Sequence, residues 1–133
     1  MSAALLCFAP ILLIAQERPA VFRIHPVRPI AELRKDALAA TPPKESGEFR
    51  KSDLVDLAAL DSRIKLEIRY ATTDNFLSTP VYTSARAFLQ RPAAEALLRA
   101  HRELMQQGYG LLIFDGYRPW YVTKIFLGCN SRR

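Results

Sequence analysis

A long amphipathic helix followed closely by a short apolar run constrains this fold more than any other part of the sequence. Residues 92–107 begin with Pro92, which suits the first turn of a helix, and carry apolar residues at helical spacing through Met105. Gly108 stands at the usual C-terminal position of such a helix. Residues 111–114 are then continuously apolar between two glycines, which predicts a buried strand. The chain therefore contains a helix that packs on a sheet.

The neighbouring segments predict an α+β domain. Residues 54–60 are apolar apart from Asp56, which indicates a first strand, and residues 64–70 alternate strictly, as in a half-buried strand. A short last helix is expected from Trp120 to about Leu127. The order strand, strand, helix, strand, helix predicts a small antiparallel or mixed sheet with helices mainly on one face.

Residues 5–15 form an apolar stretch that polar residues follow at once. The stretch is too short to cross a bilayer as a helix, which needs roughly 20 residues, so we expect no stable membrane span here. Its length fits a signal peptide over residues 1–15. We therefore expect an exported protein, periplasmic or extracellular. The alternative is a buried N-terminal strand or helix in a cytoplasmic protein.

The 133 residues indicate one domain with an N-terminal extension. Residues 16–52 contain an amphipathic helix at 30–40 and, from Pro42 and Pro43 onward, a polar linker. Residues 53–127 form the folded unit, and residues 128–133 are expected to be a divergent tail.

Charge and ligand residues exclude several kinds of partner. The net charge of +6 comes from scattered Lys and Arg without interleaved aromatic residues, so no nucleic-acid partner is expected. The histidines, His25 and His101, lie far apart in the sequence, and the two cysteines form no metal-binding motif, so no zinc site is predicted from these residues. His101 falls on the apolar face of the 92–107 helix, which indicates a core position.

Residues 115–119, Asp-Gly-Tyr-Arg-Pro, are the best candidate for a functional site because they follow the predicted buried strand. Gly116 permits a sharp turn and Pro119 fixes the next backbone angle. Arg118 can then present its planar fork to a carboxylate or an oxyanion. The alternative is an Asp115–Arg118 pair that only closes the turn.

Two segments carry a more specific pattern. Residues 68–76 read Ile-Arg-Tyr-Ala-Thr-Thr-Asp-Asn-Phe, where Tyr70 opens a polar loop that either lines a pocket or only forms turns. Residues 109–119 end in the Asp-Gly-Tyr-Arg-Pro turn, and a helix of fitting length separates the two segments. In this order they resemble the D-alanyl-D-alanine dipeptidases of the vancomycin-resistance type, over about residues 54–126.

The resemblance implies a zinc metallopeptidase that hydrolyses free D-Ala-D-Ala in cell-wall peptide metabolism. It gives Arg118 the role of transition-state stabiliser and places Asp115, Tyr117 and Tyr70 at substrate-binding positions. In the family, two histidines and an aspartate bind the zinc and a glutamate is the general base, in segments downstream of the Arg-Pro turn. This sequence contains neither segment. We therefore expect that the zinc ligands are absent from the chain and that its fold is the N-terminal part of the family's zinc D,D-peptidase fold, incomplete relative to the whole.

The resemblance favours hydrolysis of D-Ala-D-Ala, as a truncated form. One alternative is a non-catalytic module that binds D-Ala-D-Ala-like peptides through Arg118, and another is an inactive remnant. The expected partner is a small dipeptide. Self-association is expected if an exposed sheet edge is left open.

Overall fold

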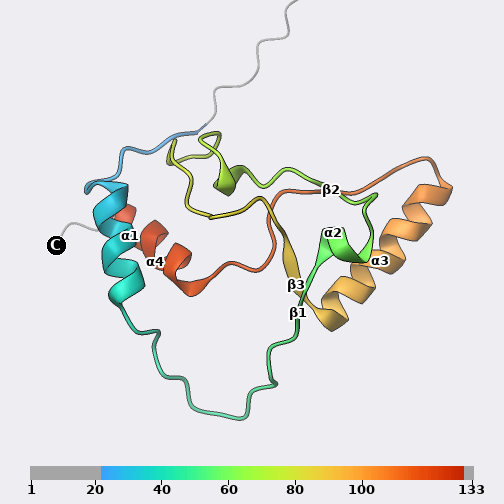
Figure 1. Cartoon of the computed structure of the whole chain (residues 1–133), viewed down its shortest axis with the longest axis horizontal. Helices are drawn as coiled ribbons and strands as arrows, with labels where there is room; N and C mark the ends of the chain where they lie inside the picture. Colours follow the sequence, from blue (N-terminus) through green and yellow to red (C-terminus); the bar gives the residue numbers. More distant parts are fainter. Residues whose placement is uncertain (1–21, 131–133) are drawn as a thin grey trace, which may run out of the picture.

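The computed structural model describes residues 22–130, which form short strands and helices (Figure 1). In chain order the elements are α1 (Ile30–Ala39), β1 (Leu54–Asp56), α2 (Leu57–Leu60), β2 (Lys65–Leu66), the 3-10 turn η1 (Arg69–Ala71), β3 (Phe88–Gln90), α3 (Arg91–Gln106), β4 (Leu112–Ile113) and α4 (Trp120–Cys129). The predicted α+β class is confirmed. The predicted signal peptide, residues 1–15, lies outside the described residues.

The strands form two separate ladders rather than one sheet. β1 and β3 pair antiparallel with Val55 opposite Leu89, and β2 and β4 pair parallel with Lys65 opposite Leu112. Both ladders position the candidate site. β4 leads into residues 115–119, and β3 forms a backbone hydrogen bond with that segment.

Two predicted strands are shorter than their sequence patterns indicated. Residues 54–60 form β1 and then α2, because the Asp56 carboxylate accepts a hydrogen bond from the Ala58 amide and caps a helical turn. Residues 64–70 form β2 and then turn into η1, although Ile64 and Ile68 are buried as the alternation predicted. β3 was not predicted, since a three-residue strand is too short to show a period.

A strand is present within residues 111–114, as predicted, but the prediction that it is buried is wrong. β4 comprises only Leu112–Ile113, and the side chains of Leu112 and Phe114 are 46% and 50% exposed. Ile113 packs against one of the two hydrophobic cores. Within residues 22–130, β4 pairs with β2 alone, so one edge of β4 is paired and no strand pairs with its other edge.

The helices lie in two groups, each with its own core (Figure 1). α1 packs against α4, and α3 packs against β1 and β3. α3 starts at Arg91 with Pro92 in its first turn, in agreement with the predicted helix. α4 extends to Cys129, beyond the predicted end near Leu127, and Cys129 is fully buried against α1.

Candidate functional site

The segment at 115–119 is fixed to strand β3 by a close backbone approach. The Tyr117 amide donates a hydrogen bond to the Phe88 carbonyl at 2.6 Å. A Cβ atom on Gly116 would lie 2.7 Å from the same carbonyl oxygen, and a real Cβ does not approach backbone that closely. Gly116 is not among the positive-φ glycines of the described chain. Glycine is therefore required here by the contact with β3, not by the turn geometry that the sequence suggested.

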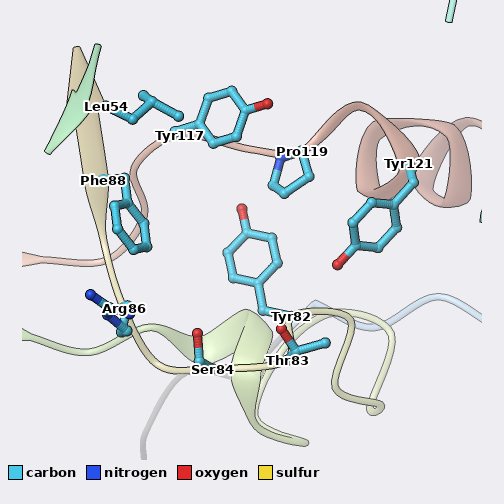
Figure 2. Close-up of a pocket in the computed structure, with 9 residues that line it drawn as sticks. All are labelled: Leu54, Tyr82, Thr83, Ser84, Arg86, Phe88, Tyr117, Pro119 and Tyr121. Carbon is cyan, nitrogen blue, oxygen red and sulfur yellow. The ribbon is translucent and has the colours of Figure 1, made fainter. Parts of the chain in front are cut away.

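The side chains of this segment line two different cavities. Asp115 and Arg118 line one of about 460 Å³. Tyr117 and Pro119 line a second of about 280 Å³, whose other walls include Tyr82, Phe88 and Tyr121 (Figure 2). The structure thus brings Asp115 and Arg118 together and places Tyr117 in a separate cavity. We call the cavity lined by Asp115 and Arg118 the Arg118 cavity. Of the two aromatic residues predicted for the substrate site, Tyr70 lines this cavity and Tyr117 does not.

The Arg118 guanidinium is held between a carboxylate and two aromatic rings. Its Nη2 lies 2.6 Å from Asp115 Oδ2. Its Cζ lies 5.3 Å from the centre of the Tyr70 ring and 5.0 Å from that of Phe126, within the range of cation–π attraction. The Arg118 side chain remains 36% exposed. Partial burial is the largest single effect and would lower the pKa of Arg118, but the hydrogen bonds and charge interactions with Asp115 and Tyr82 together outweigh it, so the pKa is raised.

Asp115 is oriented by two further donors. The Tyr82 hydroxyl donates to Asp115 Oδ1 at 2.8 Å, and the Gly116 amide donates to the same oxygen at 2.9 Å. Burial, and then the bond to Asp115, raise the pKa of Tyr82 to about 12. The phenol therefore stays protonated, and a donor, across the physiological pH range.

The Arg118 cavity presents charges of both signs on an aromatic wall. Arg69 and Asp74 lie at its rim with their charges 4.0 Å apart, and Arg69 is also paired with Glu67 at 2.6 Å. The ring of Tyr70 stands at the centre of a cluster, with neighbouring ring centres at 5.2–5.9 Å. The nine residues that line the cavity are Phe22, Arg69, Tyr70, Asp74, Asn75, Phe76, Phe114, Asp115 and Arg118.

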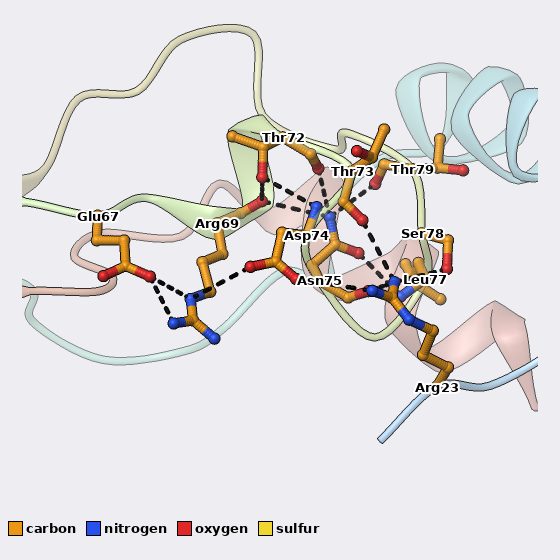
Figure 3. Close-up of polar contacts among 10 residues, drawn as sticks. All are labelled: Arg23, Glu67, Arg69, Thr72, Thr73, Asp74, Asn75, Leu77, Ser78 and Thr79. Atoms are coloured by element: carbon orange, nitrogen blue, oxygen red, sulfur yellow. Dashed lines mark hydrogen bonds and ion pairs between the residues drawn. The ribbon is translucent and has the colours of Figure 1, made fainter. Parts of the chain in front are cut away.

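A buried amide organises the loop that carries the other wall of this cavity (Figure 3). Asn75 is 4% exposed, and its Nδ2 donates to the carbonyls of Thr72 at 2.6 Å and Thr79 at 3.0 Å. Its Oδ1 accepts from the Leu77 amide at 2.8 Å. Arg23 closes the loop from outside by donating to the Asn75 carbonyl at 2.9 Å. The sequence left open whether this loop lines a pocket or only forms turns. Its polar residues do both.

Sequence reasoning missed Tyr82 and Phe126 as neighbours of Arg118. Tyr82 lies 33 positions before Asp115, and Phe126 lies on α4, where its apolar character only indicated packing. Neither has a local pattern that points to the site. The contact of Tyr82 follows from long-range pairing, and that of Phe126 from the way α4 packs after the turn; periodicity reports neither.

The zinc that the resemblance implied does not fit the residues described here. From residue 22 to residue 130, no group of three or more His, Cys, Asp or Glu side chains is arranged to hold a metal ion. His101 is 1% exposed on α3, as its place on the apolar face predicted, and it lies in no such group. In the same part of the chain, no helix has the length and apolarity that a membrane crossing requires.

Fold and site together define a small α+β protein with a fixed arginine at an aromatic-lined cavity, an arrangement suited to a small molecule that carries negative charge. The model of the D-Ala-D-Ala dipeptidase family matches residues 50–130. This match covers more than half of the chain, so the chain belongs to the D-Ala-D-Ala dipeptidase family, and the resemblance drawn from the two motifs is confirmed.

Individual relatives agree with the family. The chain is 31% identical over 96 residues to a D-alanyl-D-alanine dipeptidase of Escherichia coli, a match that covers 62% of this chain and 50% of the relative. It is 41% identical over 66 residues to one from Enterococcus faecium, covering 48% and 33%. It is 38% identical over 77 residues to one from Streptomyces coelicolor, covering 56% and 38%. The matches thus span between a third and a half of the relatives' lengths.

Proposed function

We propose that this protein acts on the dipeptide D-Ala-D-Ala and that Arg118 binds and stabilises negative charge on it during peptide hydrolysis. The observation that carries the proposal is the fixed guanidinium, held by Asp115 at 2.6 Å at the wall of a cavity of about 460 Å³. A guanidinium has five N–H donors, so one bond to Asp115 leaves capacity for a two-pronged contact with a ligand. Preorganised donors and cations at the place where oxyanion charge develops are usually the largest single contribution to the catalysis of acyl transfer.

The charge pattern of the cavity supports a zwitterionic ligand. A free dipeptide carries a carboxylate at one end and an ammonium at the other. Arg118 and Arg69 suit the first, and Asp74, whose side chain is 58% exposed at the rim, suits the second. The volume lies within the usual range for small-molecule sites.

Calorimetric titration of the full chain tests this function. We expect D-Ala-D-Ala to bind and L-Ala-L-Ala to bind at least tenfold more weakly. Arg118→Ala should abolish the difference, whereas Arg63→Ala, which removes a surface arginine paired with Asp61, should not. Released D-alanine, measured in parallel, tests hydrolysis. Stereospecific binding without release would favour the non-catalytic module, and no binding of either dipeptide would favour the inactive remnant.

We further propose export of the protein, on the basis of the apolar residues 5–15. Fusing residues 1–25 to a reporter that is active only outside the cytoplasm tests this. An inactive reporter, with the fusion present in the cell, would contradict it.

A further inference from the structure

We infer that Tyr82 is a positioning residue for Arg118, acting through Asp115. This inference rests on the proposed function for its consequence, since it concerns the arginine that would bind the dipeptide. Its structural content stands on the hydrogen bonds alone and can be measured without a ligand.

The two oxygens of the Asp115 carboxylate accept hydrogen bonds from different donors. Oδ1 accepts from the Tyr82 hydroxyl at 2.8 Å and from the Gly116 amide at 2.9 Å, and Oδ2 accepts from Arg118 at 2.6 Å. Two donors on one oxygen fix the rotation of the carboxylate, so the other oxygen is aimed at the guanidinium. The Gly116 amide belongs to the adjacent residue and constrains this rotation weakly. The Tyr82 hydroxyl reaches Asp115 from a distant part of the chain and supplies the stronger constraint.

Tyr82 is itself well anchored. Its ring packs against both hydrophobic cores, the one between α1 and α4 and the one beneath α3. It also lies 5.7 Å from the ring of Tyr70, over which the Arg118 guanidinium stacks. Figure 2 shows the Tyr82 side chain between Phe88 and Tyr121, with its hydroxyl directed toward the segment that carries Tyr117 and Pro119. One residue thus supports both the carboxylate and the aromatic ring that flank the guanidinium.

The benefit of this support is preorganisation. An arginine side chain has many rotamers, and fixing it before the ligand arrives removes that entropic cost from binding. Tyr82→Phe keeps the ring in both cores and removes only the hydroxyl. From the usual cost of immobilising one such side chain, we expect D-Ala-D-Ala to bind about 2- to 10-fold more weakly.

The deciding experiment is nuclear magnetic resonance of the Arg118 guanidinium in the ligand-free full chain. In wild type, rotation about its Nε–Cζ bond should be slow and the Tyr82 hydroxyl proton should exchange slowly. Tyr82→Phe should speed the rotation severalfold. Tyr121→Phe also preserves the ring and changes another wall of the cavity that Tyr82 lines, so it should leave the Arg118 rotation unchanged. The melting temperatures of the variants check their folding.

The outcomes separate the two proposals. Unchanged Arg118 rotation in a folded Tyr82→Phe protein would overturn the positioning role, whatever the ligand does. A fast-exchanging Tyr82 hydroxyl proton in wild type would overturn it even if the variant failed to fold. If the rotation speeds up but wild type does not bind D-Ala-D-Ala, the positioning role holds and the proposed function fails.

Discussion

Gly116 and Phe88 are in such close contact that a side chain at residue 116 would meet the backbone of strand β3. The nearest atoms to its Cβ position are the Phe88 carbonyl oxygen at 2.7 Å and the Phe88 nitrogen at 3.0 Å. The next residue, Tyr117, donates to that carbonyl at 2.6 Å. The antiparallel ladder thereby fixes the turn that carries Arg118, although the turn itself follows the parallel ladder.

Gly116→Ala is therefore expected to destabilise the fold. The added methyl meets backbone atoms that cannot rotate away, and overpacking of this kind costs about 1–3 kcal/mol. Chemical denaturation measures the loss. Gly110→Ala is the matched control, because nothing lies within 4 Å of the Cβ position of Gly110. Equal stability of the two variants would contradict the close contact.

Arg118→Ala is expected to weaken D-Ala-D-Ala binding by roughly 10- to 100-fold, which corresponds to the loss of a charge-assisted hydrogen bond. Arg118→Lys keeps the charge but loses the planar fork, so the recovery should be partial. Titration calorimetry measures both, with the melting temperature as the control for folding. If Arg118 only closes its turn with Asp115, stability should fall and the affinity of the folded fraction should not change.

Asn75 is expected to be essential for the loop at residues 69–80. Asn75→Ala leaves the buried Leu77 amide without its partner, at about 1–3 kcal/mol, and removes a donor from the part-buried carbonyls of Thr72 and Thr79. Asn75→Asp should cost more, because it turns a carboxylate oxygen toward the carbonyls. Urea unfolding compares them with Thr73→Ala, an exposed neighbour that should be near neutral. A mild effect of Asn75→Ala would show that the loop holds without its central amide.

The sequence predicted those parts of the fold that local chemistry determines. The helix that begins near Pro92 and the pairing of Asp115 with Arg118 depend on residues close together, and both are present. The strand lengths and the exposure of Leu112 and Phe114 depend on which partner strand is available. Likewise, the local sequence does not predict that Tyr117 and Arg118 line different cavities. Their separation depends on the contact of Gly116 with β3, a strand distant in the sequence.

The high pKa of Tyr82 predicts a change in stability at alkaline pH. Burial and the bond to Asp115 raise this pKa to about 12, while in the unfolded chain a tyrosine titrates near pH 10. The folded state holds the proton more tightly, so the stabilisation from this group is complete below about pH 10 and is lost as the pH rises through 12. Tyrosinate absorbance should show one late step that Tyr82→Phe removes and Tyr109→Phe retains. A late step that survives in Tyr82→Phe would assign it to another residue.

The unpaired edge of β4 leads to the last prediction, which is that the chain self-associates. Among residues 22–130, β4 has β2 on one edge and no strand on the other, and Leu112 beside that edge is 46% exposed. An unpaired edge with apolar side chains is a template for pairing with another strand. We therefore expect a second copy of the chain to bind there.

Sedimentation velocity over a range of protein concentrations measures this association. Wild type should shift toward a dimer as its concentration rises, because the association is bimolecular. Leu112→Lys places a charge at the β4 edge and should keep the protein monomeric at concentrations where wild type is dimeric. Leu38→Lys is the control, since Leu38 is 62% exposed on α1, away from this ladder, and its replacement should leave the dimer intact. A wild-type protein that stays monomeric throughout, or a Leu112→Lys dimer as stable as that of wild type, would show that the β4 edge does not mediate association.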